Sequence, residues 1–493
     1  MRRMRASAAY HFEPRVFALR PAPGVGRVLS ALRDRRGLIG LDSRGGKPRR
    51  FSLVGFDPLP DDAARTKEES RRTISDLRCM LSRLSTSRTA DLPGPFHGGF
   101  LGALAYDIGV EDEDQVLPAD PLQMPRIVGG LYCDFVFFDH PANAAWLVLG
   151  ESPGDDRDSV NRRREAFLAD LASDENRTPE SPTLLSPLER KTSADRHRQR
   201  IEKVRRFIAR GEIYQANLAH RLTQRVAGHP IDIYLGLREA NPAPYMAYLS
   251  WHAGTRSPDI DTRPTGALLS SSPELLLESD GVYATTRPVK GTIRSSSHPA
   301  TDAEARRRLL ESAKDRAELT MIVDLERNDL GRIAVPGSVR VGPYPRLETY
   351  TNLHHLVADV SCKLAEGRDA IHALGALFPG GSITGAPKLR SMEIIAALEE
   401  EGRGFFTGSA GFIDTRGHAL LNILIRTMIW KPEPEGNADE AEVTFHVGSG
   451  ITWGSIAALE EEETRLKGEA IAACLGNGRH PSLRSTRHQE ASP

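Results

Sequence analysis

The chain has 493 residues, enough for two or three ordinary domains, and its 39% hydrophobic and 27% charged residues are typical of a globular protein. Lys and Arg number 65 against 66 Asp and Glu, so the net charge of −1 gives no argument for nucleic acid or an anionic membrane as a partner. The four cysteines lack the spacing of a zinc site or a disulfide framework, and no apolar run approaches the ~18 residues that span a bilayer. We expect a cytoplasmic protein.

The first third of the chain is rich in short strand-like stretches, at 51–56, 130–138 and 145–149, with a glycine turn at Gly98-Gly99. From residue 151 the composition shifts to Asp, Arg, Ser and Pro, a mixture typical of solvated segments. The sequence therefore predicts an N-terminal β-rich region over 1–150 and a linker over 151–190.

The remainder alternates between helical and extended patterns. Ser193 can cap a helix that Gly211 ends, and apolar spacing predicts further helices over 301–325, 388–401 and 457–474. Strands are expected at 213–222, 267–271, 274–277, 282–286, 408–413, 421–430 and 443–447. Because strands outnumber parallel βαβ units, we predict an α+β fold with a mostly antiparallel core. The catalytic region would cover 191–478, and the polar tail at 479–493 would be disordered.

Two carboxylate pairs are the first candidates for chemistry. Asp315 and Glu318 lie three residues apart on one expected helix, and Glu460 and Glu463 repeat that spacing on the last one. If the pairs met across a cleft, they would offer the hard oxygen ligands that Mg²⁺ prefers. The alternative is a solvated acidic face near a helix N-terminus, where the helix dipole favours anions.

Two loops are also candidates. Residues 378–388 (Phe-Pro-Gly-Gly-Ser-Ile-Thr-Gly-Ala-Pro-Lys) precede a helix, so their backbone N–H groups could bind a carboxylate; the alternative is a structural turn. Lys290, beside Gly291 and Thr292, could be a nucleophile if its pKa is lowered, although most lysines are merely solvated.

Eight ordered motifs together resemble the chorismate-utilising enzymes, the family that contains the large subunits of anthranilate, aminodeoxychorismate, isochorismate and salicylate synthases. The resemblance covers residues 195–470 and rests on these stretches: Glu212-Ile-Tyr-Gln-Ala-Asn217, Ser272-Pro-Glu274, Pro288-Val-Lys-Gly-Thr292, Glu318 with Asp324-Leu-Glu-Arg-Asn-Asp329, His354-His-Leu-Val357, Gly381–Lys388, Ile425-Arg-Thr427, and Gly448-Ser-Gly450 with Glu460–Thr464. It implies two facing sheets wrapped by helices, and chorismate as the substrate.

Two positions place the chain within that family. Members that add water to chorismate have a lysine where Gln215 stands, whereas ammonia needs no base. Lys290 resembles the lysine of the aminodeoxychorismate synthase type, which attacks carbon 2 so that ammonia enters at carbon 4; anthranilate synthases typically have alanine there. The stretch Gly98–Asp107 also resembles the aminodeoxychorismate synthase type. The resemblance therefore favours para amination, with anthranilate synthase component I and a silent chorismate-binding subunit as alternatives.

The same resemblance implies a role for each site residue. Glu274 would protonate the departing 4-hydroxyl, and His355 would lie near the reacting carbon. Arg426 would clamp the enolpyruvyl carboxylate, and the substrate would also contact Gly381, Ser382, Gly448, Thr292 and Gln215. Glu318 and Glu463 would hold Mg²⁺, with Asp315 and Glu460 acting through water.

The chain departs from the family pattern at two places. Phe406 stands where several relatives have a tyrosine, and residues 454–457 replace the usual start of the last helix. The chain carries no glutaminase module, so ammonia would come from solution or from a separate glutamine amidotransferase subunit. Residues 40–43 and 50–58 resemble the region that forms a tryptophan pocket in relatives, which leaves open whether tryptophan binds here.

Overall fold

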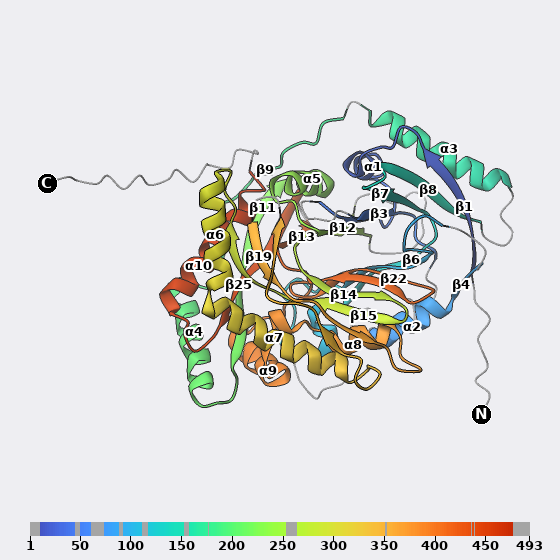
Figure 1. The fold of residues 1–493 in the computed structure, drawn as a ribbon. Coiled ribbons are helices and arrows are strands. Elements are labelled where there is room, and N and C mark those ends of the chain that lie inside the picture. Colours follow the sequence, from blue (N-terminus) through green and yellow to red (C-terminus); the bar gives the residue numbers. More distant parts are fainter. Residues whose placement is uncertain are drawn as a thin grey trace.

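The structure is a computed structural model that describes residues 10–44, 50–60, 73–87, 92–110, 117–151, 157–175, 177–252, 264–350, 353–434, 436–437 and 439–476. The tail predicted to be disordered, 479–493, lies outside the described residues. Two large sheets and one small one, covered by helices, make up the described part (Figure 1).

The larger sheet has fourteen strands in the described residues and draws on both halves of the chain. Its neighbours are antiparallel except for β1 and β4. In spatial order its strands are β10 (Glu189–Arg190), β11 (Gln215–Ala227), β25 (Glu440–Ile451), β24 (Thr427–Pro432), β13 (Gly266–Ser272), β12 (Tyr245–Trp251), β2 (Ile39–Asp42), β3 (Phe51–Gly55), β7 (Phe135–Asp139), β8 (Ala144–Glu151), β1 (Tyr10–Leu19) and β4 (Leu84–Thr86), with β9 (Thr183–Leu184) and β21 (Gly385–Ala386) paired to β11.

In the part of the chain that the structure describes, the second sheet has eight strands and a separate sheet has three. The order of the eight is β17 (Arg340–Val341), β20 (Val360–Lys363), β15 (Tyr283–Arg287), β14 (Leu275–Asp280), β23 (His418–Asn422), β22 (Ser409–Asp414), β5 (Gly99–Leu104) and β6 (Ile127–Tyr132). The small sheet is β16 (Val289–Arg294), β19 (Leu353–Val357) and β18 (Arg346–Tyr350).

The two large sheets face each other across an apolar core. Phe96 lies edge-on to Phe135 of the larger sheet at 5.1 Å and to Phe412 of the second sheet at 5.4 Å between ring centroids. Such edge-to-face contacts add to the area that the rings bury. The predicted α+β fold with two facing, mostly antiparallel sheets is therefore confirmed.

Helices cover the outer face of each sheet. Residues of α1, α3 and α5 share a core with the larger sheet, and α7 and α8 pack on the second sheet, while α4, α9 and α10 flank β11 and β25 (Figure 1). The helices are α1 (Val25–Ala31), α2 (Ile74–Ser82), α3 (Arg157–Ser173), α4 (Ala194–Ala209), α5 (Pro230–Ala240), α6 (Pro299–Glu311), α7 (Ala313–Gly331), α8 (Ala370–Leu377), α9 (Lys388–Glu399) and α10 (Ala457–Ala472), with short 3₁₀ turns η3 (Tyr106–Val110) and η4 (Gly381–Ile383). None of the helices in the described part combines the length and the apolar character that crossing a membrane requires.

Two predicted elements differ from the structure. The single helix expected over 301–325 is two helices, because Ser312 leaves helical geometry and its hydroxyl accepts the backbone N–H of Asp315 as the N-cap of α7. The segment 151–190 is not an unstructured linker, since α3 occupies 157–173 and buries Val160, Phe167 and Leu171. The predicted N-cap at Ser193 is present, with Arg196 N donating to its hydroxyl.

The N-terminal and C-terminal regions also share their sheets. β2 pairs with β12, and β5 pairs with β22, so both large sheets cross the expected boundary at 151–190. Gly102 and Gly411 pair at the second crossing, and a Cβ on either would fall within 2.3 Å of a main-chain oxygen. Close backbone approach therefore explains part of the glycine-rich stretch at 98–107.

Candidate active site

Lys290 owes its position to a bulge in β16. The strand pairs Lys290 with Leu356 and Thr292 with His355, so the register shifts by one residue between them. Gly291 supplies the bulge, since it has φ +65° and a Cβ there would meet Asp315 at 3.0 Å. A glycine in the left-handed region is the usual first residue of such a bulge, which re-aims the neighbouring side chain. The glycine of the run Lys-Gly-Thr is thus required by the local backbone.

The Lys290 amine points to the loop at 381–388. Its Nζ donates to the main-chain oxygen of Ser382 at 3.1 Å, and the same oxygen accepts Asn217 Nδ2 at 3.2 Å. Burial lowers the pKa of the Lys290 amine, while the nearby Glu318 and Glu274 carboxylates oppose that fall. Desolvation therefore moves the lysine toward the neutral amine that a nucleophile needs.

Glu274 lies in the tight connection between β13 and β14 and is 3% exposed. The Ser272 hydroxyl bonds Ile423 O at 2.6 Å, and Ile423 N bonds Glu274 O at 3.0 Å, which fixes the backbone on both sides. The carboxylate accepts Val289 N at 3.1 Å, one residue from Lys290. Burial raises the pKa of Glu274, with the Ser382 hydroxyl and the Lys290 amine opposing the rise. A buried carboxyl of this kind is suited to donate a proton near neutral pH.

Gln215 faces Lys290 across Gly450. The side chain of Gln215 is 0% exposed, and neither its Nε2 nor its Oε1 has a hydrogen-bond partner. A Cβ built on Gly450 would lie 2.7 Å from Gln215 Nε2 and 3.8 Å from Lys290 Nζ, so glycine leaves open the space between the two groups. Buried polar groups without partners are rare, and here they mark a place for a small polar ligand.

His355 and Arg426 complete the centre. The Thr292 hydroxyl bonds His355 Nδ1 at 2.9 Å, and His355 Nε2 is buried without a partner. Burial lowers the pKa of His355 to about 3, so the imidazole is neutral at pH 7. Burial also lowers the pKa of Arg426, which lies beside Glu274 and has φ +52°. A non-glycine residue in this region is strained, and such strain gathers at functional sites.

The loop at 381–388 is anchored at both ends by buried charges. Lys388 pairs with Asp329 at 2.7 Å and donates to Leu377 O at 2.8 Å. Arg403 donates to Ile383 O at 3.0 Å and to Asn217 O at 2.7 Å, while pairing with Glu399. The lysine that ends the loop is therefore structural, and Gly381, Ser382 and the β11 edge are held in register.

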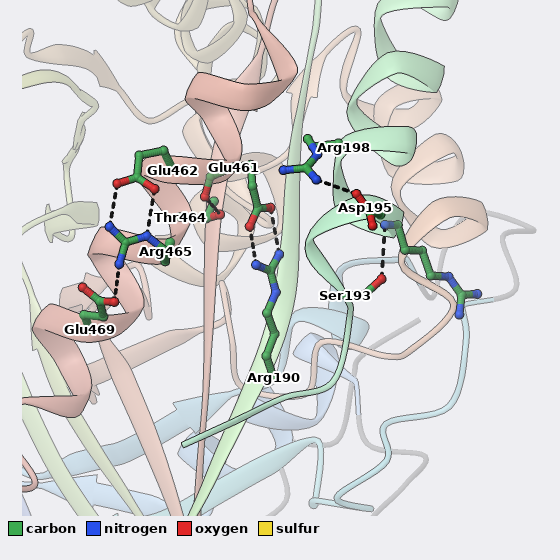
Figure 2. A network of polar contacts seen from close by, with 10 residues as sticks. Arg190, Ser193, Asp195, Arg198, Glu461, Glu462, Thr464, Arg465 and Glu469 are labelled. Atoms are coloured by element: carbon green, nitrogen blue, oxygen red, sulfur yellow. Dashed lines mark hydrogen bonds and ion pairs between the residues drawn. The ribbon is translucent and has the colours of Figure 1, made fainter. Parts of the chain in front are cut away.

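The acidic run at the start of α10 divides between two faces of the helix. Glu461 pairs with the Arg190 guanidinium of β10, and Glu462 pairs with Arg465 at 2.6 Å, as Figure 2 shows. Glu460 points elsewhere: it accepts the Ser455 hydroxyl at 2.8 Å and lies 3.9 Å from Lys314 Nζ. Glu461 and Glu462 are therefore paired with arginines, whereas Glu460, one of the two predicted metal ligands on this helix, is not.

The four predicted metal ligands are only partly brought together. Lys314 Nζ lies 3.9 Å from both Glu318 and Glu460, whereas Glu463 pairs with Lys467 at 2.6 Å. Among the described residues no three His, Cys, Asp or Glu side chains form a ready-made metal cluster. The donor set nevertheless suits a hard divalent cation, because Glu318 Oε1 is buried without a hydrogen-bond partner and its pKa is raised by burial and, among its neighbours, by Asp315 and Glu460.

Three contributors to the site were not assigned a role from the sequence. Asn217 binds the Ser382 oxygen, Lys467 donates to Gly448 O at 3.0 Å, and Glu326 is a buried carboxyl on α7. Asn217 and Glu326 lie inside motifs that the sequence singled out, so motif membership was the available signal. Lys467 is four residues after Glu463, the spacing of a helical ion pair.

A cavity lies apart from this centre, where β2, β3 and β12 meet the second sheet. Its lining includes Asp42, Arg50, Tyr245, Glu348 and Tyr350. Residues 40–43 and 50–58 thus reach the cavity through Leu41, Asp42, Ser43, Arg50 and Phe51. Tyr350 also contacts His355, with 5.2 Å between ring centroids, and so connects the cavity with the centre around Lys290.

Comparison with known proteins identifies the family of the chain. The family model for chorismate binding enzymes matches residues 41–473. Aminodeoxychorismate synthase component 1 of Bacillus subtilis is 33% identical over 448 residues, covering 88% of this chain and 90% of the relative. Anthranilate synthase component 1 of Streptomyces coelicolor is 35% identical over 442 residues, covering 86% and 81%. The crystal structure of anthranilate synthase component I from Streptococcus pneumoniae superposes with a TM-score of 0.68 at 28% identity, covering 86% of this chain and 92% of that one. The chain belongs to the chorismate binding enzyme family.

Proposed function

We propose that the chain is the chorismate-aminating subunit of an aminodeoxychorismate synthase, acting in para-aminobenzoate and folate biosynthesis. The observation that carries the proposal is the half-buried Lys290, whose amine lies 3.1 Å from Ser382 O and beside the unpartnered amide of Gln215. Sequence identity alone does not distinguish para from ortho amination, because an aminodeoxychorismate synthase is 33% identical and an anthranilate synthase is 35% identical.

The chemistry follows from what each side chain can do. The neutral Lys290 amine forms a bond to carbon 2 while the bond between carbon 4 and its hydroxyl breaks, and Glu274 gives that oxygen a proton so that water leaves. Ammonia then bonds to carbon 4 as the lysine nitrogen leaves carbon 2, and the new amine loses one proton. Two successive displacements place nitrogen at carbon 4, para to the ring carboxylate, which is the benefit of a covalent intermediate.

The other residues would bind and orient the substrate. Arg426 would hold the enolpyruvyl carboxylate as a charge-assisted clamp, and Gly381, Ser382 and Gly448 would offer main-chain groups to the carboxylates. Neutral His355 keeps Nε2 available as a hydrogen-bonding group near the reacting carbons. Gln215 cannot act as a base at neutral pH, which supports ammonia over water as the incoming group.

We propose Mg²⁺ as the cofactor, held by Glu318 and Glu463 with Asp315 and Glu460 acting through water. The ion would neutralise and orient the ring carboxylate of chorismate. Lys314 and Lys467 now neutralise these carboxylates, so they would shift when a cation binds.

Ammonia and tryptophan are the remaining proposed ligands. We propose that a separate glutamine amidotransferase subunit supplies the ammonia, and that free ammonium supports a slower reaction by the isolated chain. Tryptophan is a candidate for the cavity at Arg50 and Tyr350, whose acidic and basic groups suit an amino acid.

One assay separates the proposal from its rivals. The isolated chain is given chorismate, Mg²⁺ and ammonium, and the product is identified by chromatography and fluorescence. Aminodeoxychorismate supports the proposal, and fluorescent anthranilate replaces it with the anthranilate synthase alternative. Unchanged chorismate, in a protein that is folded by circular dichroism, indicates the silent subunit.

A further inference from the structure

Glu326 is a buried acid that the proposed reaction does not yet use. It lies on α7 in the Asp324–Asp329 motif, its side chain is 2% exposed, and its Oε2 has no hydrogen-bond partner. A carboxyl buried to this degree without a partner is costly to stability unless it carries a proton or serves a function.

The position of Glu326 is close to the reacting centre. A Cβ built on Gly381 would lie 3.8 Å from Glu326 Cγ, so the acid packs directly beneath the loop that receives Lys290. The Thr286 hydroxyl on β15 bonds its carboxyl. Glu326 therefore lies between helix α7 and the strand that leads into Lys290.

Charges on every side of Glu326 leave it without a dedicated counterion. Glu274 acts on it from the connection after β13, Lys290 from β16, Asp329 from its own helix and Lys388 from the start of α9. Lys388 is paired with Asp329 at 2.7 Å, so its charge is already compensated. Burial, with the Glu274 carboxylate as the next contribution, raises the pKa of Glu326 well above its usual range.

We propose that Glu326 is a proton store for Glu274: the two carboxyls form a buried acid pair beside Lys290, and Glu326 returns to Glu274 the proton lost to the leaving hydroxyl. The inference rests on the function proposed above and deepens it. Glu326 acts through Glu274 and has no contact of its own with the substrate in this arrangement.

The proton balance of the cycle is closed. Glu274 O–H gives its proton to the oxygen leaving carbon 4, which departs as water, and Glu326 O–H then protonates the Glu274 carboxylate. The nitrogen that becomes bonded to the ring loses one proton, and this proton restores Glu326. No outside acid or oxidant is required, and the pair titrates as a unit with two macroscopic pKa values.

The test compares Glu326→Gln with Thr286→Val, a matched change that removes the hydroxyl bonded to Glu326 but no titratable group. In Glu326→Gln we expect kcat with chorismate and ammonium to fall roughly 10-fold, with KM for chorismate nearly unchanged. The alkaline limb of the pH profile should move to lower pH, because only one carboxyl is left to hold the proton. Thr286→Val keeps both carboxyls and should move the alkaline limb of the pH profile much less than Glu326→Gln does.

An infrared measurement reads the stored proton without turnover. At neutral pH the parent should show C=O stretches from two protonated carboxylic acids, Glu274 and Glu326, and Glu326→Gln should lose one of the two contributions. Absence of the contribution that Glu326→Gln removes, an unmoved pH profile in Glu326→Gln, or a Thr286→Val enzyme that copies Glu326→Gln would each overturn the inference. If the parent made anthranilate instead, the para assignment would fail while the infrared result still decided the state of Glu326.

Discussion

The cavity at Arg50 and the centre at Lys290 are both lined by polar groups, but their hydrogen bonding differs. Around the cavity the charges are paired: Arg50 with Glu278 at 2.5 Å, Arg238 with Asp42 at 2.5 Å, and Arg287 with Asp359 at 2.5 Å. Around Lys290, buried atoms of Gln215, His355, Glu318 and Glu326 have no hydrogen-bond partner.

The difference separates recognition from catalysis. A paired site is stable when empty and rearranges little when it binds a small ligand. Unpartnered buried groups cost stability, typically 1–3 kcal/mol each, and are kept where binding or reaction compensates for the cost. The reactive centre is therefore expected to gain stability when its polar groups are removed, whereas the cavity is not.

Loss of Lys290 should have the largest effect. Lys290→Ala removes the nucleophile of the proposed covalent step, and we expect aminodeoxychorismate formation to fall by roughly 100-fold or more. Chromatography of the products measures the rate of aminodeoxychorismate formation. Lys431→Ala is the matched control, because Lys431 also donates to a main-chain oxygen, Leu122 O at 3.0 Å, and should keep full activity. Undiminished para product in Lys290→Ala would refute the nucleophilic role.

Glu274→Gln tests what a buried carboxyl of the reactive centre costs in stability. Its pKa is raised in the folded protein, so its stabilising contribution is complete below about 4.5 and is lost as pH rises through the folded pKa. The variant should lose activity roughly 100-fold yet gain about 1 kcal/mol of stability at neutral pH, measured by urea unfolding. The gain should vanish at acid pH.

The control for this stability gain is Glu278→Gln on the same region of sheet. Glu278 is partly exposed and paired with Arg50, so its loss should change the free energy of unfolding by no more than about 0.5 kcal/mol. If the free energy of unfolding changed equally in Glu274→Gln and Glu278→Gln, the buried Glu274 would not destabilise the folded protein.

The sequence identified the motifs of the site but not the contacts between elements that are distant along the chain. Lys290 lies at the bulge of β16 and Gln215 begins β11, but Ser382 lies in the 3₁₀ turn η4, outside any strand. The spacing of the motifs along the chain does not show that these places adjoin. The helix α3 was missed because its buried residues, Val160, Phe167 and Leu171, form only a narrow stripe in a highly charged segment. Arginine partners from distant strands, such as Arg190 for Glu461, also cannot be read from spacing within one helix.

A smaller effect is expected at the carboxylates of α10. Glu463→Gln should weaken the response to Mg²⁺ by roughly 10-fold, because a neutral amide is a poorer ligand for the ion. Activity is followed as Mg²⁺ is titrated. The neighbouring Glu462, paired with Arg465 rather than with Lys467, gives the control Glu462→Gln, which should titrate like the parent (Figure 2). If Glu463→Gln also matched the parent, the metal assignment would fail.

The smallest effect is expected at the cavity. Tryptophan at about 100 times its Kd should stabilise the chain by about 2.7 kcal/mol, seen as a higher melting temperature. Arg50→Ala should weaken that binding by roughly 10-fold, equivalent to about 1.4 kcal/mol. Arg225→Ala, which also breaks an exposed Arg–Glu pair, with Glu433, but lies outside the cavity lining, should leave binding unchanged.

Any effect of tryptophan on chorismate binding must be reciprocal. Tyr350 lines the cavity and contacts His355, so a ligand there can alter the position of the imidazole. If tryptophan lowers the affinity for chorismate by some factor, chorismate must lower the affinity for tryptophan by the same factor. Calorimetric titration of each ligand in the presence of the other measures both factors. Equal factors above one would show that the two sites are coupled, and factors of one would show that tryptophan binds in the cavity without affecting the chorismate site.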